Sequence, residues 1–118
     1  PRICTPLGLW NRSTAPLSLA VVGGGYLGCE LAHAWACAGS QVVVVEAGPA
    51  LLPGFDPDAA ARVRSLLEAA GVGCMDSVRV TGFSDASDGS MLQLGGVPFP
   101  VEIAVVAVGL NPVFPCDP

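Results

Sequence analysis

A glycine-rich segment at residues 23–28, GGGYLG, limits the folds open to this chain more than any other feature. It follows a short apolar run at residues 17–22 and precedes a segment, 26–38, whose apolar residues recur at helical spacing. An apolar run without alternation is typical of a strand buried on both faces, as in a parallel sheet. The pattern therefore predicts a strand, a tight turn and a helix in direct succession.

The following residues repeat this arrangement. Residues 41–46 contain four consecutive valines and predict a second buried strand. Asp56, Pro57 and Asp58 suit the first turn of a second helix, which Gly71 would end. Its apolar face would be formed by Val63, Leu66, Leu67 and Ala70, and a solvated face by Arg62, Arg64 and Glu68. After residue 72, short segments separated by turn residues predict a small antiparallel meander, and the apolar run at 103–108 predicts a returning strand.

These elements predict an α/β fold, namely a Rossmann-like three-layer domain with a central, mainly parallel sheet and a small antiparallel β-meander. We expect the domain to span residues 17–113. Residues 1–16 hold three prolines and no clear period, so we expect a connector or a disordered end. Residues 114–118 would form a tail.

Composition argues against several classes of function. The net charge of −5 offers no basic stripe for a nucleic-acid backbone. The apolar region at 17–38 is broken by glycines, Glu30 and His33, so we expect no membrane span. The five cysteines form no CxxC pair, which argues against a zinc site or disulfide framework. We expect no metal and a reducing, cytoplasmic setting.

The glycine segment fits the pattern GxGxxG through Gly23, Gly25 and Gly28, in the strand–turn–helix context that the pattern requires. Gly23 would permit the tight turn, Gly25 would leave room for a pyrophosphate, and Gly28 would let the helix pack closely on the strand. Free backbone N–H groups of the first helical turn, which includes Leu27, would then face the phosphates. The segment predicts a dinucleotide site.

Glu46 ends the second predicted strand, where an acidic residue can bind the hydroxyls of the adenosine ribose. A carboxylate there would repel the 2′-phosphate of NADP, and neither Ala47 nor Gly48 supplies a positive charge to offset it. We therefore expect the cofactor to be NAD.

Three ordered motifs carry a closer resemblance. Residues 18–32 (SLAVVGGGYLGCELA), residues 51–56 (LLPGFD) and residues 107–112 (AVGLNP) resemble motifs of the NAD domain in the pyridine nucleotide-disulfide oxidoreductases. That family includes dihydrolipoyl dehydrogenase, glutathione reductase and mercuric reductase. The resemblance implies an NAD(H)-binding domain of an FAD-dependent enzyme, which presents NADH for hydride transfer to the flavin.

The resemblance also implies roles for single residues. Tyr26 is similar to the aromatic residue that covers the nicotinamide pocket beside the flavin, and Glu30 to the glutamate that helps hold the carboxamide. Val80 matches a position whose backbone lies near the adenine, and Gly109 one that approaches the nicotinamide end. No catalytic residue is expected within the chain.

The chain also departs from the family pattern. The redox-active CxxxxC pair is absent, and Leu110 stands where the closing motif usually has Arg. We expect FAD to be bound mainly by another domain of the parent enzyme, with a dimerisation domain as a further partner, and the isolated chain to be inactive. Two alternatives stay open: an FAD-binding domain of a related flavoprotein, or a non-catalytic nucleotide-binding remnant.

Overall fold

The computed structural model describes residues 2–86 and 89–111. Its central layer is a five-stranded sheet in which every pair of neighbouring strands is parallel, in the order β1-β8-β2-β3-β4. The bounds of these strands are β1 Ile3–Cys4, β2 Ser18–Val22, β3 Gln41–Val45, β4 Gly73–Met75 and β8 Ile103–Val106.

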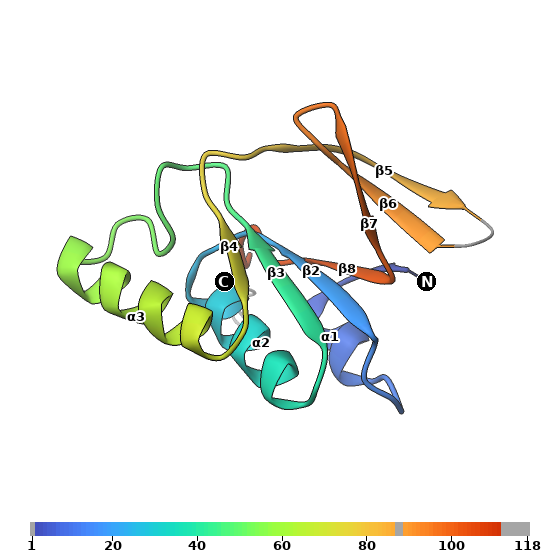
Figure 1. The fold of residues 1–118 in the computed structure, drawn as a ribbon, viewed down its shortest axis with the longest axis horizontal. Coiled ribbons are helices and arrows are strands. Elements are labelled where there is room, and N and C mark those ends of the chain that lie inside the picture. Colours follow the sequence, from blue (N-terminus) through green and yellow to red (C-terminus); the bar gives the residue numbers. More distant parts are fainter. Residues whose placement is uncertain (1, 87–88, 112–118) are drawn as a thin grey trace, which may run out of the picture.

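The two other layers lie on opposite faces of this sheet (Figure 1). One face carries the helices α1 (Pro6–Trp10), α2 (Tyr26–Cys37) and α3 (Pro57–Ala69). The other carries an antiparallel sheet in the order β5-β6-β7, formed by Val80–Ala86, Gly89–Leu94 and Val97–Val101. The expected three-layer α/β fold with a small β-meander is confirmed.

Alternation along the central strands explains why they read as unbroken apolar runs. Val42 and Val44 of β3 pack into the core beneath the helices, whereas Val43 and Val45 pack into the core beneath the antiparallel sheet. Successive side chains of a strand point to opposite faces, so a strand covered on both faces must be apolar at every position. The four valines therefore serve two cores at once.

Residues 3–10 form a strand and a helix instead of the expected connector or disordered end. Ile3 and Cys4 pair in parallel with Ala104 and Val105 of β8, which makes β1 an edge strand. The Thr5 side chain accepts a hydrogen bond from the Gly8 N–H and begins α1, with Pro6 in the first turn, where proline is tolerated. Leu9 is fully buried in the helix-side core. Pro6, one of the prolines that predicted a connector, in fact stands at a helix start.

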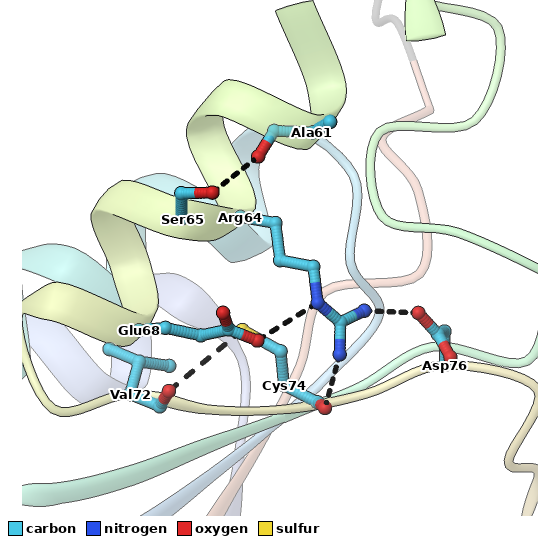
Figure 2. Close-up of polar contacts among 7 residues, drawn as sticks. All are labelled: Ala61, Arg64, Ser65, Glu68, Val72, Cys74 and Asp76. Carbon is cyan, nitrogen blue, oxygen red and sulfur yellow. Dashed lines mark hydrogen bonds and ion pairs between the residues drawn. The ribbon is translucent and has the colours of Figure 1, made fainter. Parts of the chain in front are cut away.

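Helix α3 packs differently from the expectation based on the sequence. Ala60 and Leu67 are buried and Val63 is half-buried, but Leu66, expected on the apolar face, is half exposed. Arg64, expected on a solvated face, instead spans from α3 to β4 (Figure 2). Its guanidinium donates to the Cys74 carbonyl at 3.1 Å, to Glu68 at 2.9 Å, and to the Asp76 carboxylate.

Some expectations lie outside the described residues. They are the part of the expected antiparallel meander that falls on residues 87–88, the end of the closing motif at Pro112, the last residue of the expected domain at 113, and the tail at 114–118.

Candidate functional site

A pocket of about 440 Å³ opens at the carboxyl edge of the parallel sheet. It lies where β2, β3 and β8 end, and Val22, Val45 and Ala107 form part of its wall. In open α/β sheets, ligands bind in the crevice outside the carboxyl ends of the strands, so this is the position at which the fold favours a binding site.

Two glycines of the turn are required by close backbone contacts. Gly23 has a φ of 109°, and a Cβ on it would clash with the carbonyl oxygen of Ala107. A Cβ on Gly28 would clash with the carbonyl oxygen of Gly23 and meet Val21 Cγ1 at 3.4 Å. Gly23 thus lets β2 turn beside the end of β8, and Gly28 lets α2 pack directly under that turn.

Gly25 has a different environment from Gly23 and Gly28. No heavy atom lies within 4 Å of a Cβ built on it, and it faces the pocket as the N-cap residue of α2. Within the described ranges, no side chain forms a capping hydrogen bond with this helix. The first N–H groups of a helix have no intrahelical partner and lie at its positive dipole end. The turn therefore presents open space and backbone donors to the pocket, which together suit an anion.

Glu46 follows β3 and is fixed on the rim of the same pocket. Its Oε2 accepts a hydrogen bond from the Gly24 N–H at 2.7 Å, and its Oε1 accepts one from the Gly48 N–H at 2.8 Å. A carboxylate has about four acceptor positions, so each oxygen keeps capacity for a ligand hydroxyl. A Cβ on Gly24, a residue that we had not singled out, would meet Leu51 Cδ2 at 2.6 Å, so a side chain here would have to displace Leu51.

The structure brings most of the predicted site residues into one pocket. Its lining includes Gly23, Gly25, Tyr26, Leu27, Glu46, Val80 and Gly109. Gly28 is buried beneath the turn and does not line the pocket. Glu30 is exposed on α2 and also stands outside the lining. Tyr26 is 54% exposed at the mouth.

Sequence reasoning missed the segment before Val80. Val78 and Arg79 also line the pocket, since the Val78 N–H donates to the Glu46 carbonyl at 3.0 Å and joins this segment to the end of β3. The only sequence signal was adjacency to Val80, which the resemblance had already assigned to the adenine side.

Cys29 lies directly under the turn, where its thiol donates to the Gly24 carbonyl at 3.6 Å. Burial, with smaller contributions from the nearby Cys74 and Glu46, raises the pKa of this thiol to about 11. The residue is therefore a protonated packing group near neutral pH rather than a thiolate nucleophile. Among the described residues, no group of three or more metal-binding side chains gathers, and no helix is long and apolar enough to cross a membrane.

The fold defines a Rossmann-like α/β domain with a pocket at a glycine turn. A sequence model of the family described as pyridine nucleotide-disulphide oxidoreductase matches residues 1–114. The chain belongs to this family of oxidoreductases. The match includes β1 and α1, which we had expected to lie outside the domain.

Individual relatives agree with the family match. The chain is 35% identical over 88 residues to dihydrolipoyl dehydrogenase of Geobacillus stearothermophilus, a match covering 75% of this chain and 19% of that protein. It is 35% identical over 95 residues to NADH oxidase of Methanocaldococcus jannaschii, covering 80% and 21% respectively. The chain therefore spans about a fifth of the length of these relatives.

Among solved structures, the flavoprotein disulfide reductase RclA of Escherichia coli superimposes with a TM-score of 0.87 at 29% identity. The superposition covers 92% of this chain and 25% of that protein.

Proposed function

We propose that this chain binds NADH and serves as the NAD(H)-binding domain of an FAD-dependent pyridine nucleotide oxidoreductase. The observation that carries the proposal is the pocket in which the open turn at Gly25 stands beside the fixed carboxylate of Glu46. A dinucleotide needs both an anion site and a ribose-binding acceptor, and the chain supplies them at the ends of adjacent strands.

The described residues fit such a ligand. The space over Gly25 and the uncapped N-terminus of α2 would hold the pyrophosphate, and Glu46 would accept hydrogen bonds from the adenosine ribose hydroxyls. Val80 would lie beside the adenine, while Tyr26, Glu30 and Gly109 would serve the nicotinamide end. NADH supplies a hydride for FAD, and this chain would bind and orient the nicotinamide.

The relatives support this assignment. The names of the matched proteins include NADH oxidase, and RclA is called a flavoprotein. We propose that FAD and the dimerisation surface belong mainly to other domains of the parent enzyme, and that the enzyme acts in the cytoplasm. The chain by itself should then bind NADH without turning it over.

Calorimetric titration of the chain with NADH, NADPH and FAD tests the proposal. We expect NADH to bind more tightly than NADPH, because the Glu46 carboxylate would repel a 2′-phosphate. Tighter binding of FAD than of NADH would favour an FAD-binding domain instead. Absence of binding by all three would overturn the proposed function.

Turnover is tested separately. NADH oxidation by the chain, followed at 340 nm with added FAD and a dye acceptor, should stay at the rate without protein. Turnover of about 1 per second or more would be typical of a complete enzyme and would contradict the proposed division of labour.

A further inference from the structure

Arg79 is the single basic residue among the described residues that line the pocket. It is exposed, and within the described part of the chain no ion pair or side-chain hydrogen bond is formed by its guanidinium. The chain as a whole carries a net charge of −5, so a cation at this position stands out against its surroundings. An unpaired guanidinium in a pocket is a ready contact for a phosphate or carboxylate.

The backbone around Arg79 is fixed on both sides. Before it, the Val78 N–H donates to the Glu46 carbonyl at 3.0 Å and the Ser77 N–H donates to the Gly48 carbonyl at 2.7 Å. At Arg79 itself, the carbonyl accepts the Gly95 N–H at 2.9 Å. The side chain therefore extends from an ordered segment whose neighbour is bonded to Glu46.

Arg64 of α3 binds the residues that precede this segment (Figure 2). Its bonds to the Cys74 carbonyl and the Asp76 carboxylate hold the chain to α3 just before Ser77. Ser77 has a φ of 54°, a left-handed conformation in which a non-glycine residue is uncommon. The segment from Cys74 to Arg79 is thus hydrogen-bonded both to α3 and to residues 46–48, which follow β3.

Glu46 does not neutralise Arg79. Both oxygens of the Glu46 carboxylate bind backbone N–H groups, of Gly24 and Gly48, and no ion pair joins it to Arg79. The adenosine side of the pocket therefore presents a fixed carboxylate and an uncommitted guanidinium on neighbouring segments. The first would disfavour a phosphate on the ribose and the second would attract it.

We propose that Arg79 is a specificity-determining residue that can bind a phosphate on the adenosine ribose. In the unaltered chain, repulsion by the Glu46 carboxylate outweighs this attraction. This inference rests on the proposed function, because it needs adenosine beside Glu46. It adds a cation to the pocket where the sequence around Glu46 offered none. Removal of the Glu46 charge alone should shift the binding preference of the chain toward nucleotides with a 2′-phosphate. This shift in preference should depend on Arg79.

The experiment compares adenosine 2′,5′-bisphosphate with AMP, which differ only by the 2′-phosphate, using calorimetric titration of the chain. In Glu46→Ser, the preference for the bisphosphate over AMP should rise about tenfold, the effect of one charge-assisted hydrogen bond. In the double variant Glu46→Ser/Arg79→Gln, this rise should disappear. Arg62→Gln is the matched control, since Arg62 is exposed on α3 and does not line the pocket.

Two results would overturn the proposal: a rise that persists in the double variant, or an Arg79→Gln variant that weakens AMP and the bisphosphate equally. If Glu46→Ser fails to fold, Glu46→Gln keeps the side-chain length and one acceptor oxygen, and the same comparison applies. Binding of AMP and NADH by the unaltered chain tests the proposed function separately, so the failure of one is distinguishable from the failure of the other.

Discussion

Helices α2 and α3 both follow a strand of the parallel sheet, yet their first turns are completed in opposite ways. The N-cap of α3 is Asp56, whose Oδ1 accepts the N–H groups of Asp58 and Ala59 at 3.0 Å each. Pro57 and Asp58 complete a self-sufficient start. The N-cap of α2 is Gly25, which has no side chain and leaves the turn facing the pocket.

The capped start of α3 stabilises its helix, whereas the uncapped start of α2 leaves backbone N–H groups open to a ligand. An aspartate cap stabilises a helix by about 1 kcal/mol, and a glycine in its place costs only a few tenths. The α2 start gives up little capping free energy and gains room and donors for an anion. The buried face of α2, which includes Gly28, Leu31 and Trp35, packs it into the core instead.

The largest effect should come from Gly28→Ala. The added Cβ would clash with the Gly23 carbonyl oxygen, a backbone atom that cannot move away without displacing the turn. We expect the free energy of unfolding to fall by about 3 kcal/mol or more, as for a severely overpacked core. Urea unfolding followed by circular dichroism measures this. Gly25→Ala, with open space around its Cβ, is the control and should lose no more than about 1 kcal/mol, the cost of alanine at an N-cap.

Gly25→Val should weaken NADH binding and leave the fold intact, in contrast to Gly28→Ala. A branched side chain at the open position would occupy the space proposed for the pyrophosphate, while nothing within 4 Å of the Cβ opposes it in the folded chain. We expect NADH affinity to fall about a hundredfold or more with the far-ultraviolet spectrum unchanged, since one displaced phosphate removes several charge-assisted bonds. Unchanged affinity would show that the phosphates lie elsewhere.

Asp56→Ala tests the capped start of α3 and should lower stability without weakening NADH binding. Removal of the carboxylate leaves two N–H groups of α3 without their acceptor, and the chain should lose about 1 kcal/mol of unfolding free energy. NADH affinity should stay within about twofold of the unaltered chain, because Asp56 does not line the nucleotide pocket. A large loss of affinity would mean that the two helix starts are coupled.

The elements around this contrast differ in how far the sequence alone revealed them. The β2–α2–β3 unit and the start of α3 carry local signals, since apolar runs, glycines and Asp56-Pro57 are each readable within a few residues. Strand β1 was missed because its two residues gain their partner only from β8, about a hundred positions along the chain. Such a pairing leaves no periodic signal.

The same reason explains what was missed in the pocket. Gly23, Gly25 and Glu46 belong to a pattern with fixed spacing, and the structure places all three in one pocket. Arg79 reaches that pocket only because Val78 bonds to the Glu46 carbonyl across the sheet edge. Arg64 likewise meets Asp76 through tertiary packing of α3 on β4, so its exposed-looking helical position misled the interpretation.

The smallest expected effect concerns pH and the thiol beneath the α2 turn. The pKa of Cys29 is raised from 9.0 to about 11, mainly by burial. As pH rises from 9, the unfolded chain loses this proton first, so the folded state binds more protons and stability must fall with pH until about pH 11. One proton changes the free energy of unfolding by at most about 1.4 kcal/mol per pH unit.

Cys29→Ala should therefore lose less stability than the unaltered chain between pH 9 and pH 11, whatever its stability at pH 7. Urea unfolding at several pH values gives the two slopes, and their difference isolates Cys29 because the remaining titrating groups are shared. Equal slopes for Cys29→Ala and the unaltered chain would show that the thiol under the open turn is more solvated than its position beneath Gly24 implies.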